Sequence, residues 1–141
     1  MTDTAFFDTN LFVYLYDARV PQKREIAQDL FKRYFGIRKG AMSTQVLQEF
    51  FVAVTRKTGL LTVAEAAAAV ADFSALDNLV IVQPHHILEA IRLHLKLRIS
   101  FWDGLILAAA KAASASLLYS EDLSPGRVYE GVRVENPFLV H

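Results

Sequence analysis

The stretch Ala5-Phe6-Phe7-Asp8-Thr9-Asn10, close to the N-terminus, is a short apolar run that ends on an acidic residue. Phenylalanine is typical of buried β-strands, so residues 5–7 are predicted to form the first strand of a sheet. In open parallel sheets, ligands gather outside the carboxyl ends of the strands. Asp8 stands at that position, and the question is which other side chains meet it there.

The composition indicates a single globular domain, 1–141. The chain has 141 residues, 53% of them hydrophobic, and its 15 basic residues balance its 15 acidic ones. Zero net charge argues against a protein that coats nucleic acid non-specifically. The absence of cysteine excludes disulfides, thiolate catalysis and cysteine-ligated zinc. The first residues lack the layout of a signal peptide, and no apolar run approaches the roughly 20 residues of a membrane helix. We therefore expect a cytoplasmic protein without a membrane segment.

Strand-like and helix-like segments alternate along the chain. Short apolar runs predict strands at 5–7, 41–43, 79–82, 117–119 and 132–134. Helical spacing of apolar residues predicts a packed turn at 11–16 and helices at 21–36, 44–57, 62–76, 88–98 and 101–114. Connections of helical length between short strands imply βαβ units, and hence an α/β fold with a mainly parallel sheet covered on both faces.

Four acidic residues occupy positions that this fold would bring together. Asp8 and Asp122 each follow a predicted strand, while Glu49 and Asp103 lie in the first turns of helices that begin at strand ends. Asp103 is the most informative, because the other residues from 101 to 110 carry no charge. Burying an unpaired carboxylate costs several kcal/mol or more.

Each acid also has a purely structural interpretation. Asp8 could cap the following turn, and Glu49 could be a solvated residue beside an apolar stripe. Ser100 and Asp103 have the spacing of a capping box, and Asp122 could be an ordinary turn residue. Taken together, the four positions favour a site. Carboxylates a few ångströms apart repel one another, and a hard divalent cation with oxygen ligands offsets that repulsion. Magnesium and manganese are the metals that such ligands prefer. Glu121 competes with Asp122 for the fourth position.

Four short motifs, in order along the chain, resemble those of PIN-domain proteins, specifically the VapC toxin ribonucleases of toxin–antitoxin pairs. They are Asp8-Thr9-Asn10, Ser43-Thr44-Gln45-Val46-Leu47-Gln48-Glu49, Phe101-Trp102-Asp103 and Ser120-Glu121-Asp122. The fourth motif is usually Thr-x-Asp in the family, and serine keeps the hydroxyl. The resemblance covers essentially the whole chain.

The resemblance implies a PIN-like three-layer α/β/α sandwich with a mainly parallel five-stranded sheet. It also implies Mg²⁺- or Mn²⁺-dependent endoribonuclease activity, a homodimer and inhibition by a small antitoxin. On this hypothesis Asp8, Glu49, Asp103 and Asp122 hold one or two metal ions, with Asp8 and Asp103 as direct ligands. Side chains expected to orient carboxylates or water are Thr9, Asn10, Ser43 and Ser120.

Other residues receive weaker assignments. Candidates for phosphate contacts, unless they simply form solvated helix faces, are Arg56, Lys57, Arg92, Lys96, Arg98 and Lys111. His85, His86 and His94 lack metal-ligand spacing and are expected at the surface or a helix start. Phe101 and Trp102 could stack a base, but core packing is the preferred interpretation.

Two other functions compete with the ribonuclease. One is an α/β phosphatase with Asp8 as a nucleophile, although such enzymes usually carry a second aspartate where Asn10 stands. The other is a non-catalytic PIN-like module that binds RNA or a protein.

Overall fold

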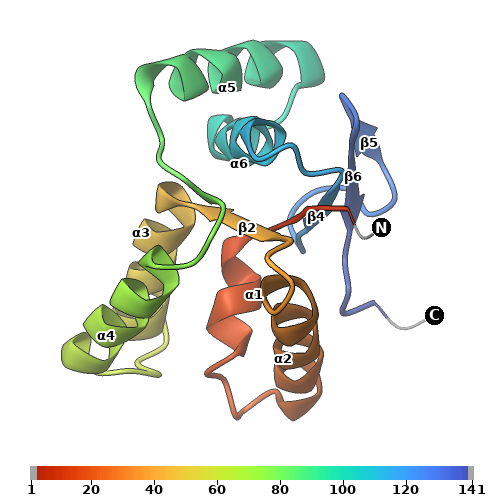
Figure 1. Ribbon diagram of the computed structural model, residues 1–141. Coiled ribbons are helices and arrows are strands. Elements are labelled where there is room, and N and C mark those ends of the chain that lie inside the picture. Colours follow the sequence, from red (N-terminus) through yellow and green to blue (C-terminus); the bar gives the residue numbers. More distant parts are fainter. Residues whose placement is uncertain (1–2, 140–141) are drawn as a thin grey trace.

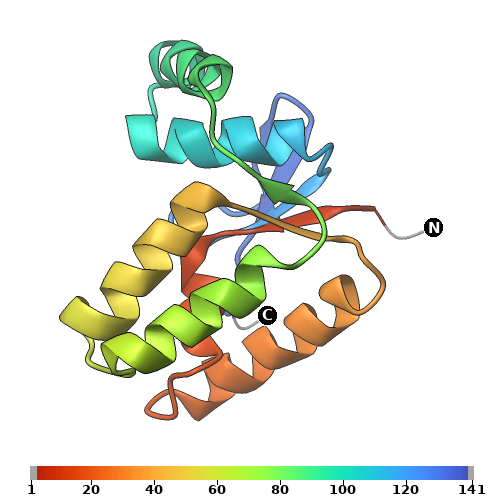
Figure 2. The same cartoon turned by 60° about the vertical axis from the view of Figure 1, so that its left-hand side comes forward.

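The computed structural model describes residues 3–139. Its strands are β1 (Ala5–Phe7), β2 (Gly40–Ser43), β3 (Leu79–Val80), β4 (Leu117–Tyr119), β5 (Val128–Tyr129) and β6 (Val132–Glu135). Its α-helices are α1 (Thr9–Tyr14), α2 (Pro21–Phe35), α3 (Thr44–Val52), α4 (Val63–Ser74), α5 (Pro84–Leu97) and α6 (Phe101–Ala112). A π-helix, η1 (Ala53–Lys57), continues α3. Helices lie on both sides of the sheet, with α5 and α6 on one side and α1 to α4 on the other (Figures 1 and 2).

The sheet confirms the predicted α/β class. Its strand order is β3-β2-β1-β4-β6-β5, and the first five of these strands run parallel. Strand β5 pairs antiparallel with β6 and was not predicted, because a two-residue strand leaves no periodic signal. The sheet is therefore mixed, with six strands of which five form the predicted parallel part.

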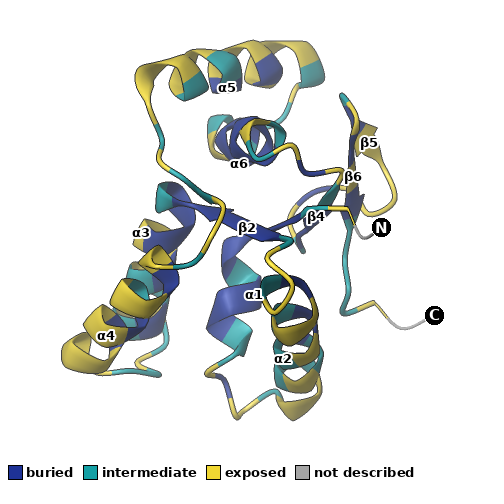
Figure 3. Cartoon of the chain, in the orientation of Figure 1, coloured by how far each residue is buried: buried dark blue, intermediate teal, exposed yellow. Residues whose placement is uncertain are grey.

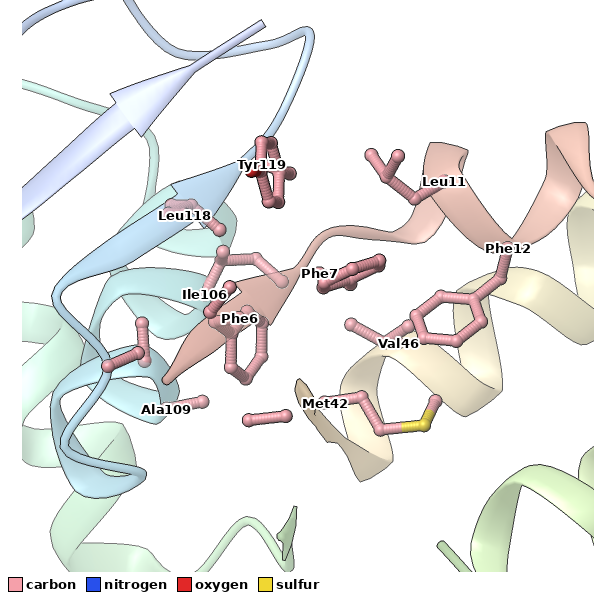
Figure 4. Close-up of a cluster of buried hydrophobic side chains, with 14 of the residues drawn as sticks. Phe6, Phe7, Leu11, Phe12, Met42, Val46, Ile106, Ala109, Leu118 and Tyr119 are labelled. Carbon is pink, nitrogen blue, oxygen red and sulfur yellow. The ribbon is translucent and has the colours of Figure 1, made fainter. Parts of the chain in front are cut away.

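Strand β1 lies at the centre of the parallel part, as its apolar sequence predicts. Phe6 and Phe7 are almost fully buried on opposite faces of the sheet. In Figure 4, Phe6 lies on the side of Ile106 and Ala109 of α6. The Phe7 ring contacts aromatic rings on the other face, with centroids 5.1 to 6.1 Å apart, from Phe12, Tyr34, Phe35 and Tyr119. Burial of a phenylalanine side chain contributes about 2–3 kcal/mol, so β1 is anchored from both faces.

Two of the predicted elements differ from the structure. The strand predicted over 79–82 is only Leu79–Val80, because β3 is at the edge of the sheet and Ile81 beyond it is 60% exposed. The helix predicted over 88–98 begins at Pro84, and its apolar residues Leu88 and Leu95 point to solvent. The reason is that α5 packs on α6 rather than on the sheet, so only a narrow stripe of it is covered (Figure 3).

No helix among residues 3–139 is long and apolar enough to cross a membrane.

Candidate functional site

The register of the parallel strands determines where the site lies. Phe7 pairs with Tyr119, and the next backbone bond, from Asp8 N–H to the Tyr119 carbonyl, is 3.0 Å long. Asp8 is therefore level with Ser120, at the carboxyl ends of β1 and β4. The Ser120 hydroxyl donates a 2.7 Å bond to Asp8 Oδ2 and accepts a 3.1 Å bond from the Asp122 N–H. One buried serine thus links the first and the last of the four predicted acids.

Asp8 is held on both of its oxygens. Asp8 is the N-cap of α1, and its Oδ1 accepts a 2.7 Å hydrogen bond from the Thr9 N–H. Only 5% of Asp8 is exposed. Burial, helped by the charges of Asp122 and Glu49, raises the pKa of Asp8 to about 6, although the Ser120 and Thr9 bonds oppose the shift. The predicted capping role and the predicted site role therefore coincide in one side chain.

Glu49 comes to the same place from α3. Its Oε1 accepts a 2.7 Å bond from the Thr9 hydroxyl, so Thr9 connects Asp8 to Glu49. Helix α3 starts at the end of β2, where Ser43 is the N-cap and its hydroxyl accepts from Val46 N–H at 3.4 Å. Ser43 was expected to orient a carboxylate or water; in the structure its hydroxyl is directed to the helix cap.

Asp122 and Asp103 complete the acidic cluster. Burial raises the pKa of Asp122, and the charges of Asp103, Glu121 and Glu49 raise it further. Asp103 is half-buried in the first turn of α6, and its N–H donates to the Ser100 hydroxyl at 3.0 Å. That contact is the forward half of the predicted capping box, and the charge of Asp103 is close enough to act on Asp122.

Glu121, the predicted competitor of Asp122, is engaged elsewhere. Its Oε1 accepts a 2.7 Å bond from the Tyr14 hydroxyl, and its Oε2 pairs with Lys23 Nζ at 2.8 Å. Both partners come from the α1–α2 side of the loop. The carboxylate that this loop offers to the cluster is therefore that of Asp122.

These side chains surround a cavity of about 660 Å³. Its acidic lining is Asp8, Glu49 and Asp122, and its polar lining includes Thr9, Asn10, Gln45 and Gln48. Apolar and basic positions of the wall are Val13, Val52, Ala53, Trp102 and Lys57. Asp103 is not part of this lining, so its influence on the cluster is through its charge on Asp122.

Trp102 contradicts the expectation of core packing. Its residue is 62% exposed and lines the cavity, whereas the preceding Phe101 is half-buried and meets it edge to face at 5.1 Å between ring centroids. The reason is position: Trp102 is the second residue of α6, in the first turn after the short connection from α5, and the covered side of that helix is taken by residues 104–110.

Gln45 belongs to the site, and sequence reasoning missed it. Its residue is 4% exposed, and its Nε2 donates to the Trp102 carbonyl at 3.3 Å and, over 3.5 Å, to Glu49 Oε2. Its Oε1 is a buried acceptor without a partner within the described chain. Turning the amide over would direct Oε1 at two other acceptors, so the observed orientation is favoured. A glutamine within Ser43–Glu49 carries no signal of its own.

The predicted phosphate contacts divide into two groups. Arg92, Lys96 and Lys111 form ion pairs with Glu89 and Glu130 that connect α5 and α6 to the β5–β6 turn. These side chains therefore join parts of the fold, a role that neither the phosphate-contact nor the solvated-face interpretation included. Lys57, at the end of η1, lines the acidic cavity.

The histidines have local partners at the ends of α5. His86 Nδ1 accepts a 3.0 Å bond from the Gln83 N–H at the start of the helix, and His94 Nδ1 contacts the Ile99 carbonyl just beyond its end. These contacts give His86 and His94 local roles at the ends of α5, so the acidic cluster is the candidate functional site.

Comparison with protein families matches residues 5–131 to the PIN domain. The chain belongs to the PIN-domain family. The resemblance seen in the four sequence motifs is thereby confirmed, and the PIN match spans all four acids of the cluster. No curated protein gives a significant match to the sequence.

Solved structures with the same PIN fold include toxins of toxin–antitoxin systems. VapC20 from Mycobacterium tuberculosis, a toxin that cleaves the sarcin–ricin loop, is 22% identical, with 84% of this chain and 90% of that chain covered and a TM-score of 0.64. A toxin–antitoxin complex from Klebsiella pneumoniae is 18% identical, with 97% and 100% covered and a TM-score of 0.71. The DNA-bound VapBC complex from Salmonella typhimurium is 15% identical, with 95% and 98% covered and a TM-score of 0.66. At these identities the likeness establishes the fold.

Proposed function

We propose that this PIN domain, spanning the whole chain 1–141, is an endoribonuclease that depends on Mg²⁺ or Mn²⁺ and acts as the toxin of a toxin–antitoxin pair. The observation that supports the proposal most is the convergence of Asp8, Glu49 and Asp122 on one cavity, with Asp103 close enough to raise the pKa of Asp122. The charges of neighbouring acids help to raise the pKa values of Asp8 and Asp122, and a bound cation would offset that repulsion.

The residues present fit a hard divalent cation. All of the donors are carboxylate oxygens, which Mg²⁺ and Mn²⁺ prefer. No group of three or more His, Asp or Glu side chains within residues 3–139 is arranged as a ligand set for one ion. Mg²⁺ usually binds through one or two carboxylates and keeps several waters. We propose Asp8 as a direct ligand, with Glu49 and Asp122 acting partly through water. Asp103, expected from the sequence to be a second direct ligand, lies outside the cavity lining and would act through water or through its charge.

A bound divalent ion supplies an acidified water and neutralises charge on the phosphate during in-line displacement. The chain's own residues prepare for that chemistry. Thr9 and Ser120 fix the carboxylates of Asp8 and Glu49 in place through three bonds of 2.7 Å, so little reorganisation remains at the moment of reaction. Lys57, on the lining of the same cavity, provides a positive charge for a phosphate of the substrate.

The proposed partners are a small antitoxin and a second copy of the chain. Solved toxin–antitoxin complexes share the fold, which supports the antitoxin. An apolar groove of about 500 Å³ lies between α3 and α4, lined by Leu47, Phe51, Val52, Ala67 and Val70. The exposed face of α5, with Leu88, Ile91 and Leu95, offers apolar area for the homodimer. Both surfaces are consistent with a protein that works in the cytoplasm, in contact with RNA and with its inhibitor.

The test is cleavage of total RNA with the sites mapped, in Mg²⁺, in Mn²⁺ and in EDTA. We expect cleavage in either metal and none in EDTA. Asp8→Asn and Asp103→Asn are expected to abolish it with the fold intact, and Asp77→Asn, at an exposed acid outside the cavity, serves as the matched control. Full activity in both site variants would remove the metal-site claim.

Two other results would favour the competing functions. A covalent phosphate trapped on Asp8 would indicate a phosphatase with an aspartyl nucleophile. RNA binding without cleavage in Mn²⁺ would indicate a non-catalytic module.

A further inference from the structure

The indole of Trp102 forms an exposed apolar wall beside the acidic cluster. A tryptophan buries a large apolar area when it is covered, so leaving 62% of one exposed forgoes stabilisation that a core position would give. The exposure is confined to the second residue of α6, since most of the helix beyond it is buried. The exposed ring also lies on the lining of the one cavity that contains Asp8, Glu49 and Asp122.

The backbone of Trp102 is tied to the helix that carries Glu49. The Trp102 carbonyl accepts a bond from Gln45 Nε2, and the same Nε2 lies 3.5 Å from Glu49 Oε2. Phe101 braces the indole edge to face, with the two rings inclined by 75°. The α6 end of the cavity is therefore tied through Gln45 to the helix that carries Glu49.

The rest of the wall suits a flat, partly apolar group with a phosphate attached. Val13, Val52 and Ala53 contribute apolar side chains to the same lining, and Lys57 contributes a positive charge. The π-helix η1 ends at Lys57, so it is the irregular turn after α3 that presents this charge. An aromatic face, a cation and a set of acids suited to metal are together what an unpaired nucleotide needs. A base inside a duplex offers no open face to the indole.

We propose that Trp102 is a stacking platform for one unpaired base of the RNA substrate, next to the phosphate that is cleaved. This inference rests on the proposed nuclease function and adds the requirement for an exposed base. Gln45 is then a positioning residue, because it acts through the Trp102 backbone and Glu49 rather than on the RNA.

The chain contains a single tryptophan, so its fluorescence reports on this position alone. The experiment titrates the wild-type protein in Ca²⁺ with a short single-stranded oligoribonucleotide, with an abasic version of the same strand and with its duplex. A gel confirms that the RNA stays intact. We expect the single strand to quench the indole emission and the abasic strand and the duplex to leave it unchanged.

Affinity is measured separately with a fluorescently labelled strand, because the variants lack the tryptophan. Trp102→Phe is expected to bind within about threefold of wild type, and Trp102→Ala about 5- to 100-fold more weakly, the range that loss of base–aromatic stacking gives. The matched control is Val128→Ala, at a residue that is 59% exposed on β5 and outside this cavity. It is expected to bind as wild type does.

Equal affinity of Trp102→Ala and wild type, or equal quenching by the abasic strand, would overturn the stacking platform. If the wild type still cleaved RNA in that case, the nuclease proposal would stand alone. Base-dependent quenching by a protein that cleaves no RNA in Mn²⁺ would support the platform and reject the nuclease. If a protein partner quenched the indole emission and no RNA strand did, the stacking platform would also be rejected.

Discussion

The strongest quantitative consequence of the site is that Asp8 destabilises the metal-free protein at neutral pH. Its carboxyl has a pKa raised from 3.8 to about 6, chiefly by burial. The folded state therefore binds the proton more tightly than the unfolded chain does. The stability that protonation provides is fully present below about pH 3.8 and is lost as the pH rises through about 6. At about 1.4 kcal/mol per pKa unit, ionised Asp8 costs the fold about 3 kcal/mol.

Asp8→Asn removes this cost, because an amide stays neutral and retains one acceptor and one donor. We expect the variant to match wild type near pH 4 and to be more stable by about 3 kcal/mol near pH 8 in EDTA, a difference of about 10 °C in Tm. The measurement is urea unfolding of both proteins across that pH range. Adding Mg²⁺ near pH 8 is expected to stabilise wild type far more than the variant, by about 2.7 kcal/mol at 100 times its Kd.

The matched control is Asp17→Asn. Asp17 is as buried as Asp8, but its pKa is lowered by the hydrogen bonds and charge of Arg19. Its contribution therefore has the opposite sign: it is present above the ordinary carboxyl pKa and is lost as the pH falls. A stability difference between Asp8→Asn and wild type that stays constant from about pH 4 to 8 would refute the reasoning, since Asp8 would then ionise normally.

Two further predictions concern other parts of the fold. Asp122→Asn is expected to abolish RNA cleavage while Glu121→Gln retains it, because Glu121 is bound to Tyr14 and Lys23; equal loss in a cleavage assay would contradict this assignment. Gly104→Ala is expected to destabilise the protein by about 1–3 kcal/mol in urea unfolding, because its Cβ would lie 2.7 Å from the Ala90 carbonyl oxygen of α5; an unchanged midpoint would show that the two helices can separate at little cost.

Much of this architecture could be predicted from local patterns. Apolar runs bounded by polar or turn residues identified β1 and β4 with their bounds, and the proline that opens α2 marked its first residue. The four acids could be proposed because a parallel sheet brings strand ends together whatever the loop lengths. Periodicity carries the most information where an element touches the core on one side only.

The remaining features depend on contacts that periodicity does not record. Helix α5 has an apolar stripe, but it packs on α6, so Leu88 and Leu95 face solvent. Trp102 is apolar and lies outside the core because it occupies the first turn of its helix. The partners of Glu121 come from 98 and 107 residues away in the sequence, and no local rule anticipates such pairs.

The Ser120 hydroxyl, which is hydrogen-bonded to both Asp8 and Asp122, has a consequence for biosynthesis. The ribosome makes Asp8 at the beginning of the chain and Ser120 near its end, yet these two residues are hydrogen-bonded across 112 positions. A nascent polypeptide that has not yet placed β4 beside β1 lacks this contact, so its acids remain apart. The acidic cluster therefore assembles only after β4 has been synthesised and has paired with β1.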